Sequence, residues 1–336
     1  MIGHPLPYGG RAGKSPRHPA RFFIPLAVLA ILIVVAAALL AGCGSAATTS
    51  PTASPPTTST AKATYPVTVT DDDKNTVTIA KEPTRIVSTA PSNTEILFAL
   101  GLGGRVVGVS SLDDYPPAAK AIAKVGDSQA NTESVMGRAP DLVVGYSGNE
   151  EALAPIAKTG VPVLIFNPSS LAGIYANIDT IGRATGATLQ AAALVAKMKA
   201  QVQAVVSTVA KTGTSPTVFY ALDDTLWTAG PGSFVDELIH LAGGTNVADK
   251  NAGPATKAYF QLAAEQLVAL NPDVVLLPET TFKSVAQFTG DPRFASLTAV
   301  KNGRVLLIND VIITRPGPRV AEGLKALAAA IHPEAF

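Results

Sequence analysis

Cysteine is almost absent from this chain. Cys43 is the only one among 336 residues, so no intramolecular disulfide can form. Histidine is scarce as well: of four in the chain, only His240 and His332 follow Cys43. Two distant imidazoles cannot supply the converging nitrogen ligands of a receptor for transition-metal ions. We therefore predict neither a metal site nor a cofactor.

Catalytic motifs are missing too. The sequence contains no Gly-x-x-x-x-Gly-Lys-Ser/Thr phosphate loop, no Gly-x-Ser-x-Gly elbow and no His-Glu-x-x-His helix. The glycines at 101–104 and 230–233 are typical of helix ends and turns, and His240 is predicted to be an ordinary histidine of an apolar helix. We predict that the protein is not an enzyme, with an anchored α/β enzyme as a distant alternative.

Charge is low and unevenly placed. Charged residues make up 15% of the chain and the net charge is +1, but four basic residues precede residue 22 and no acid precedes Asp71. Removing those four takes the balance from +1 to −3. Because no Lys/Arg cluster follows residue 21, a nucleic-acid partner is excluded.

The longest apolar run extends from Phe22 to Gly42. Its length suits a membrane-spanning helix, but the basic residues before it and the small residues at its end suit a secretory signal. Cys43 favours the second interpretation, because Leu40-Ala41-Gly42-Cys43 resembles the bacterial lipobox, whose cysteine becomes the lipid-modified N-terminus. We predict a signal peptide over 1–43 with lipidation at Cys43. The mature protein would then be extracytoplasmic and anchored to the outer face of the cell membrane.

Residues 44–64 are predicted to be a tether. From Ser45 to Thr64 the composition is Ala, Ser, Thr and Pro apart from Lys62, which cannot form a core. As a flexible coil this segment would reach roughly 25 Å.

A short pattern occurs twice in the remaining chain. ESVMGRAPDLVV begins at Glu133 and EQLVALNPDVVL begins at Glu265, 132 residues later. Each copy places a glutamate seven residues before a Pro-Asp pair, which an apolar run follows. The interval is too long for a solenoid repeat and suits one copy in each of two similar lobes.

Strand and helix patterns alternate on both sides of the chain's middle. After a predicted β-hairpin at an edge, Val67 to Ile79, they run from Arg85 to about 166 and again from 217 to 331. Such alternation predicts parallel sheets with helices on their faces. Ser92 and Glu95 have the spacing of a capping box, which predicts a helix start just after Pro91.

The segment from Leu171 to about Lys211 contains no proline and has helical periodicity. It predicts one long helix, or two nearly continuous ones broken near Gly186; a helix of about 30 residues would be about 45 Å long. The fold class is therefore α/β, with two Rossmann-like lobes joined by a long backbone helix and a ligand cleft between them. We assign 65–171 and 213–336 to the lobes and 172–212 to the connecting helix.

Ligands of open α/β sheets bind beyond the carboxyl ends of the strands. The loops at those places offer hydroxyls, amides, carboxylates and aromatic faces. Two acidic pairs lie in these loops, Asp113-Asp114 and Asp223-Asp224. They are either solvated turn residues or residues that contact the ligand. The polar candidates for ligand contact are Ser92, Asn93, Asp114, Ser128 and Arg315.

RIVSTAPSNTEILFALGLGGRVVGVSSLDDYPPAAK, together with WTAGPGSFVDELIHLAGGTNV and TRPGPRVAEG, resembles the periplasmic-binding proteins of the iron-siderophore, haem and vitamin B12 class, receptors of ABC importers. The likeness extends from about Arg85 to His332. SSLDDYPP is most similar to the vitamin B12 receptor. The resemblance implies a monomer that captures a corrinoid and delivers it to a permease dimer, with Tyr115, Tyr146, Trp227 and Tyr259 at or near the ligand.

The chain departs from that receptor at Leu112, at Ser128 and at Val311, where the receptor has aromatic residues. No tyrosine stands near Asp127, where haem-binding relatives have their iron ligand, which argues against haem. Anionic ferric siderophores usually need convergent arginines; Arg315 and Arg319 are the obvious candidates, so a ferric-siderophore receptor stays the alternative.

The same resemblance implies a role for the repeated glutamates. In this class each lobe presents one surface glutamate that meets arginines of the permease, and Glu133 and Glu265 match those positions. A structural explanation is also open, because an acid in the first turn of a helix is favoured by the helix dipole by about 0.3–1 kcal/mol without any partner.

Overall fold

Two parallel sheets with matching strand order form the framework of the computed structural model, which describes residues 64–251 and 258–336. These residues belong to one compact unit, residues 60–336. Cys43, the apolar run before it and nearly all of the tether lie outside the described residues. Among the helices of the described ranges, none has the length and hydropathy needed to cross a bilayer.

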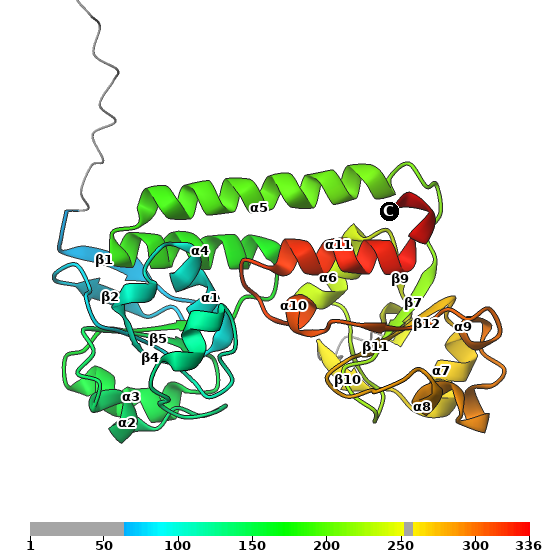
Figure 1. The fold of residues 1–336 in the computed structure, drawn as a ribbon, viewed down its shortest axis with the longest axis horizontal. Helices are drawn as coiled ribbons and strands as arrows, with labels where there is room; N and C mark the ends of the chain where they lie inside the picture. Colours follow the sequence, from blue (N-terminus) through cyan, green and yellow to red (C-terminus); the bar gives the residue numbers. More distant parts are fainter. Residues whose placement is uncertain (1–63, 252–257) are drawn as a thin grey trace, which may run out of the picture. The chain divides into compact units, whose positions relative to one another are not determined.

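The first lobe contains a four-stranded sheet in which all neighbours are parallel (Figure 1). Its strands are β3 (Ile86–Ser88), β4 (Val106–Gly108), β5 (Leu142–Tyr146) and β6 (Val163–Phe166), in the order β4-β3-β5-β6. Its helices are α1 (Pro91–Ala99), α2 (Thr132–Met136) and α3 (Glu150–Lys158), with short 3-10 turns at Gly103–Arg105 and Pro117–Ala121. Residues 142–144 of β5 are fully buried, as expected for a strand covered on both faces.

The second lobe repeats this plan. Its parallel strands are β7 (Thr217–Tyr220), β9 (Thr245–Asn246), β11 (Val274–Pro278) and β12 (Val305–Ile308), in the order β9-β7-β11-β12. A separate antiparallel ribbon pairs β8 (Trp227–Ala229) with β10 (Tyr259–Gln261). The helices of the second lobe are α6 (Phe234–Leu241), α7 (Ala264–Leu270), α8 (Ala286–Thr289), α9 (Thr298–Lys301), α10 (Val311–Thr314) and α11 (Val320–Ile331). Its 3-10 turns are η5 (Val247–Asn251), η6 (Pro292–Phe294) and η7 (Pro333–Ala335).

The aspartates of the two Pro-Asp pairs make equivalent hydrogen bonds in the two lobes. The Asp141 carboxylate accepts a hydrogen bond from the Thr84 N–H at 2.9 Å, and the Asp273 carboxylate accepts one from the Thr217 N–H at 2.8 Å. Each carboxylate also accepts the hydroxyl of the same threonine. Each aspartate thereby fixes the start of the neighbouring strand, β3 or β7, which confirms that the two copies of the pattern are structurally equivalent.

The predicted hairpin is present as β1 (Val67–Thr70) and β2 (Thr76–Ile79), with Val67 opposite Ile79. It is a sheet of its own, and its turn joins the edge strand β6. The Asp71 carboxylate accepts the Ile165 N–H at 3.0 Å, and the Asp72 N–H donates to the Ile165 carbonyl at 3.1 Å. The predicted edge position is therefore correct.

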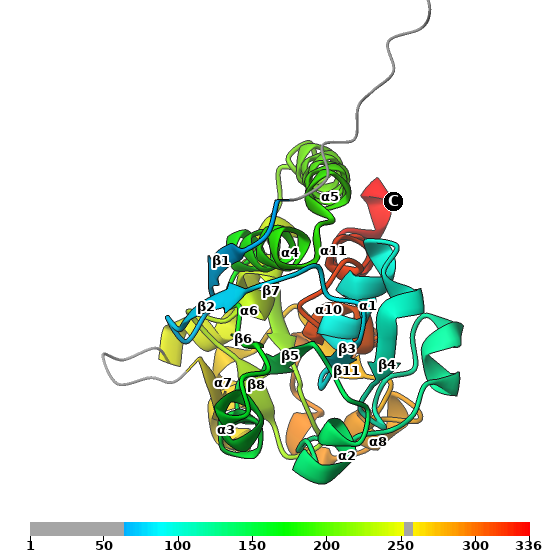
Figure 2. The ribbon, with the colours of Figure 1, turned by 90° about the vertical axis from the view of Figure 1, so that its left-hand side faces the viewer.

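The connecting segment differs from the predicted long or nearly continuous helix. α4 (Leu171–Thr185) ends at Gly186, which has a left-handed backbone with φ of 77°, and α5 (Thr188–Val209) then runs back beside α4 (Figures 1 and 2). The break near Gly186 was predicted correctly, but the two helices form a hairpin and do not continue each other. A Cβ atom on Gly182 would lie 2.4 Å from Cβ of Ala191, so the close packing of the pair depends on small residues.

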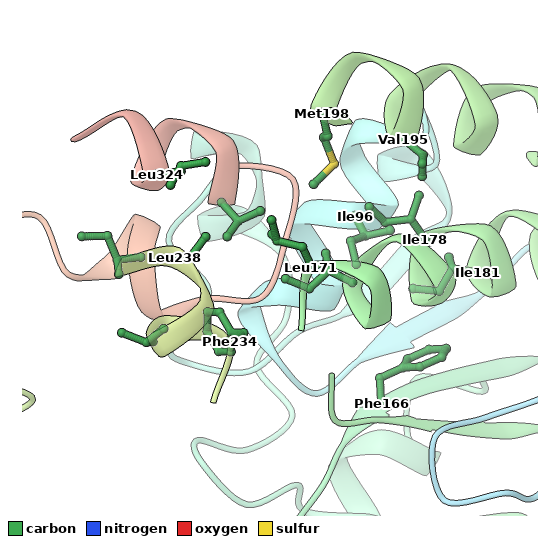
Figure 3. Close-up of a cluster of buried hydrophobic side chains, with 14 of the residues drawn as sticks. Ile96, Phe166, Leu171, Ile178, Ile181, Val195, Met198, Phe234, Leu238 and Leu324 are labelled. Atoms are coloured by element: carbon green, nitrogen blue, oxygen red, sulfur yellow. The ribbon is translucent and has the colours of Figure 1, made fainter. Parts of the chain in front are cut away.

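α5 is therefore the helix that runs from one lobe to the other, while the first residue of α4, Leu171, donates its N–H to Glu237 of the second lobe at 2.7 Å. α5 has 22 residues, about 33 Å of helix, and packs on α4 of the first lobe and on α11 of the second. One continuous cluster of buried apolar side chains follows the same path, from Ile96 and Phe166 through Leu171 to Leu238 and Leu324 (Figure 3). The lobes thus share a core on this side.

Candidate ligand-binding site

Large apolar side chains are exposed in the loops that follow the strands of both lobes. Leu112 and Tyr115 follow β4, and Trp227 and Tyr259 lie on the β8–β10 ribbon; all four are exposed by 38–51%. Exposed apolar groups of this size are unfavourable in water and, when they gather, mark binding surfaces. These four residues with Tyr146 and Arg315 are called the candidate ligand surface below.

The ribbon presents two of these aromatic rings on one face. Trp227 pairs with Gln261 and Ala229 pairs with Tyr259. Because side chains alternate along a strand and paired residues share a face, Trp227 and Tyr259 project from the same side of the ribbon. The Asp223 carboxylate accepts the N–H groups of Thr225 and Trp227 at 2.8 and 3.2 Å, so it is a turn residue that positions the tryptophan.

Tyr146 and Tyr259 come from different lobes and lie near each other. Burial raises the pKa of Tyr259, and the neighbouring Tyr146 phenol raises it further. Burial also raises the pKa of Tyr146, with a smaller contribution from the Asp72 carboxylate. Both phenols are therefore neutral hydrogen-bonding groups at physiological pH.

An ion-pair network joins the lobes next to Tyr115. Glu95 of α1, whose side chain is 1% exposed, accepts hydrogen bonds from Nε and a terminal nitrogen of Arg319 at 2.9 and 2.5 Å. Arg315 contacts Glu95 at 3.3 Å and Asp114 at 2.5 Å. The Arg319 guanidinium also lies 4.1 Å from the centre of the Tyr115 ring, a cation–π contact.

The network carries no formal net charge, because Glu95 and Asp114 balance Arg315 and Arg319. Partial burial acts to raise the pKa of Asp114, but the Arg315 hydrogen bond and charge outweigh it and hold that pKa below its usual value. Both arginines are therefore already paired with carboxylates of this chain.

The polar candidates of the first lobe have mixed positions. Asn93 is buried, and its amide donates to the Gly145 carbonyl at 2.8 Å. Ser92 is buried against Gly317, on which a Cβ atom would lie 3.4 Å from the Ser92 carbonyl oxygen. Ser128 is exposed, and its hydroxyl lies 3.4 Å from Asp127. The structure thus pairs Arg315 with Asp114 and places Tyr115 against Arg319. Separately, it places Tyr146 near Tyr259, which shares a face of the ribbon with Trp227. Asn93 and Ser92 make their contacts inside the protein.

The predicted capping box at α1 is wrong. The helix begins at Pro91 with Ala90 as its N-cap, and no side chain caps it. Glu95 is turned to the two arginines, which offer charged donors that a backbone N–H cannot match. The role of Glu95 is the feature that sequence reasoning missed; the available signal was that Glu95 is the one charged residue of α1.

Comparison with known proteins agrees with this architecture. The family model for periplasmic binding proteins matches residues 86–311. The chain belongs to this periplasmic binding protein family. It is 35% identical over 315 residues to an uncharacterized ABC transporter substrate-binding lipoprotein, YvrC, of Bacillus subtilis, covering 90% of this chain and 96% of the relative.

Two further members are similar over most of their length. A cobalamin-binding protein of Halobacterium salinarum is 34% identical over 281 residues, which cover 80% of this chain and 74% of the relative. The apo structure of the periplasmic haem-binding protein RhuT from Roseiflexus sp. RS-1 has 30% sequence identity and a TM-score of 0.68, covering 75% of this chain and 99% of RhuT. As a periplasmic binding protein, the chain is a solute-binding component of an ABC importer, in the class that takes up vitamin B12, siderophores or haem, and not an enzyme.

The repeated glutamates of this periplasmic binding protein occupy matching positions. Glu133 is the second residue of α2 and Glu265 the second residue of α7, and both are exposed. Within residues 64–251 and 258–336 neither carboxylate has a hydrogen-bond or ion-pair partner. In Figure 1, α2 and α7 lie below the sheets of their lobes, on the side away from α5. Both acids therefore lie on the surface, and the Glu265 charge acts on the nearby Arg293 guanidinium.

Proposed function

We propose that this chain is a lipid-anchored extracytoplasmic receptor that captures a corrinoid, vitamin B12 or a related cobamide, and delivers it to the permease dimer of its importer. The observations that carry the proposal are the pairing of Arg315 and Arg319 with Glu95 and Asp114 and the exposure of the rings of Tyr115, Trp227 and Tyr259. The ion pairs indicate the charge of the ligand, and the aromatic rings indicate its shape.

The charge balance favours a ligand without net negative charge. Ferric siderophores and haem propionates are anionic and call for guanidinium groups that are free to receive them. Withdrawing Arg319 toward a ligand would leave the buried Glu95 carboxylate short of its counter-ion, a change that costs about 3–5 kcal/mol when a buried pair is broken. The amide-rich periphery of a corrinoid makes no such demand.

The aromatic side chains suit a wide, largely apolar ring system. Tyr115, Trp227 and Tyr259 offer exposed faces, and Tyr146 offers a neutral phenol for hydrogen bonding. Burying such rings against a macrocycle releases a large apolar area and leaves the phenol groups to bind amides. The cobalamin-binding relative from Halobacterium salinarum supports this choice.

Haem is the ligand that the similar RhuT structure suggests. Against it stands Asp127, at the place where haem-binding relatives are expected to have a tyrosine. Its carboxylate accepts the Gln129 N–H at 3.1 Å in an exposed turn and offers no phenolate to iron. Haem therefore enters the experiment as a competitor.

Anchoring and delivery follow from two further parts of the sequence. Lipidation of Cys43 would hold the receptor at the membrane, with residues 44–64 as the tether. Glu133 and Glu265 would then dock one on each permease subunit, because equivalent positions in two equivalent lobes fit a partner with two-fold pseudo-symmetry.

Ligand titration of the full-length chain in detergent tests the proposal. Cobalamin, cobinamide, haem and several ferric siderophores are compared by calorimetry or by quenching of Trp227 fluorescence. We expect cobalamin or cobinamide to bind most tightly. Preference for haem or a siderophore would replace the corrinoid assignment, and binding of no ligand at up to about 1 mM would overturn the receptor itself.

Variants of the ribbon test whether the binding surface is correctly placed. Trp227→Ala and Tyr259→Ala should each weaken corrinoid binding by about 1–3 kcal/mol, roughly 5- to 150-fold in Kd. Leu189→Ala removes another exposed apolar side chain, on α5, and should leave the Kd unchanged. Equal affinity of all three variants would show that the ligand binds elsewhere.

A further inference from the structure

His240 lies between two carboxylates on the second lobe and is not one of the residues of the candidate ligand surface. Its Nε2 atom is 3.0 Å from an oxygen of Asp249 and 3.4 Å from an oxygen of Asp236. One nitrogen and two oxygens all lie within 4.8 Å of one another. The histidine is thus more than an ordinary residue of an apolar helix.

The local fold explains why these three groups converge. Asp236 and His240 are four residues apart in α6, so they share a face of the helix. Asp249 comes from η5, the turn that follows β9. Asn246 connects the two elements: its amide donates to Asp236 at 2.8 Å, and its carbonyl oxygen accepts the Ala248 N–H at 3.1 Å. Asn246 therefore orients both carboxylate-bearing segments before any ligand arrives.

The charges of the cluster do not balance. Two carboxylates face one imidazole, and among the described residues no lysine or arginine lies within ion-pair distance of Asp236 or Asp249. Asp236 is buried, and one oxygen of Asp249 is buried without a hydrogen-bond partner in the described part of the chain. A positive charge placed among these atoms would relieve both deficits.

The spacing is also compatible with a small cation. Nitrogen and oxygen ligands of tetrahedral zinc, at about 2.0–2.2 Å from the ion, are about 3.3–3.5 Å apart. The two distances from Nε2 are close to this edge length. His240 is 46% exposed, which leaves the open side to a water ligand and gives the ion a way in.

We propose that Asp236, His240 and Asp249 form a binding site for a divalent transition-metal ion, with Zn²⁺ as the probe. Imidazole with carboxylates is a ligand set that zinc accepts, whereas Mg²⁺ and Ca²⁺ prefer oxygen ligands alone. The ion clips η5 to α6 and so stabilises the second lobe. The site does not depend on which solute the receptor carries.

Zinc binding to the chelator-treated full-length chain tests this site. After dialysis against Zn²⁺, metal analysis should find one more equivalent in the wild-type chain than in His240→Gln. Calorimetry should show that this equivalent binds at least about 10-fold more weakly, or not at all, in the variant. Melting temperature should rise with Zn²⁺ in the wild type and stay constant in His240→Gln.

Two substitutions at Asp249 separate metal ligation from simple charge pairing. Asp249→Ala should lose the equivalent, whereas Asp249→His should keep it, because imidazole can replace carboxylate as a zinc ligand. Equal zinc content and equal Zn²⁺-dependent melting in wild type and His240→Gln would overturn the proposal.

Discussion

The Glu95 carboxylate accepts two hydrogen bonds from the Arg319 guanidinium across the junction of the lobes, at 2.5 and 2.9 Å. Arg315 adds a third contact at 3.3 Å. Since the Glu95 side chain is 1% exposed, these two arginines rather than water surround its carboxylate. The pair fixes how α1 sits against the segment that leads into α11.

Glu95→Ala should therefore destabilise the protein strongly. The substitution leaves two partly buried guanidinium groups without their shared counter-ion, and breaking a buried pair costs about 3–5 kcal/mol. Urea denaturation of both chains measures the free energy of unfolding. Glu82→Ala is the matched control: it also removes an arginine partner, at 2.7 Å from Arg105, but both side chains are about one-third exposed. A loss below about 1 kcal/mol is expected there, and similar losses in both variants would contradict the importance of burial.

Asp141 should make stability depend on pH. Partial burial acts to raise the pKa of Asp141, but the N–H groups of Thr84 and Arg85 and the Thr84 hydroxyl outweigh it and lower that pKa. A folded-state pKa below the unfolded value of about 3.9 means that the stabilisation is complete above that pH. It is lost as pH falls through the folded-state pKa.

Asp141→Asn should therefore lower the free energy of unfolding at pH 7 by about 1 kcal/mol, the low end for charged hydrogen bonds because the site is largely exposed. The difference in free energy of unfolding between the variant and the wild type should become smaller as pH falls below about 4. Denaturation curves between pH 3 and 7 measure it. A difference that stays constant across this range would mean that charge plays no part. Asp179→Asn, which removes an exposed carboxylate on α4, is the control and should change stability at pH 7 by a few tenths of a kcal/mol.

The two-lobed fold was predictable because its signals are local or repeated. Strand and helix periodicity, the Pro-Asp pairs at Asp141 and Asp273, and the turn glycine at Gly186 all act over a few residues. The direction of α5 after Gly186 was not predictable in this way, because it depends on how Gly182 receives Ala191 from the next helix. Small residues at both places were the only hint of that close crossing.

The candidate site divides along the same line. Its aromatic members stay predictions, which rest on the family resemblance and on their positions near the ends of strands. The partner of Glu95 could not be predicted, because Arg319 is 224 residues away in sequence and no local pattern around Glu95 indicates such a contact. Asn93 has a contact that its sequence did not reveal. Its loop position predicted ligand contact, and its amide nitrogen donates to the Gly145 carbonyl.

Ligand binding should cause little movement of one lobe against the other. The cluster of buried side chains that includes Ile96, Leu171 and Leu324 is continuous across both lobes, and α5 packs on helices of each. Opening the lobes widely would break this packing and expose apolar area at about 25 cal/mol per Å². Small-angle scattering of the full-length chain with and without cobalamin should give nearly superimposable curves. A clearly smaller radius of gyration with cobalamin would show that the lobes close on the ligand despite the shared core.

The final prediction concerns the exposed glutamates of α2 and α7. If each meets an arginine of the permease in a largely desolvated contact, Glu133→Ala and Glu265→Ala should each cost docking about 2–5 kcal/mol, mostly as faster dissociation. Uptake of labelled cobalamin should fall in cells where either variant replaces the native chain, and fall further with both. Ligand affinity of the purified variants should stay unchanged, because neither residue belongs to the candidate ligand surface.

Glu151 supplies the control that separates docking from helix stabilisation. It is an exposed first-turn acid of α3, so Glu151→Ala removes the same helix-dipole interaction, about 0.3–1 kcal/mol, without touching a repeated position. All three single variants should therefore melt slightly lower and by similar amounts. Only Glu133→Ala and Glu265→Ala should depress uptake. If Glu151→Ala impaired uptake equally, the loss would reflect stability, and if none of the three did, the repeated glutamates would be helix-stabilising acids with no role in docking.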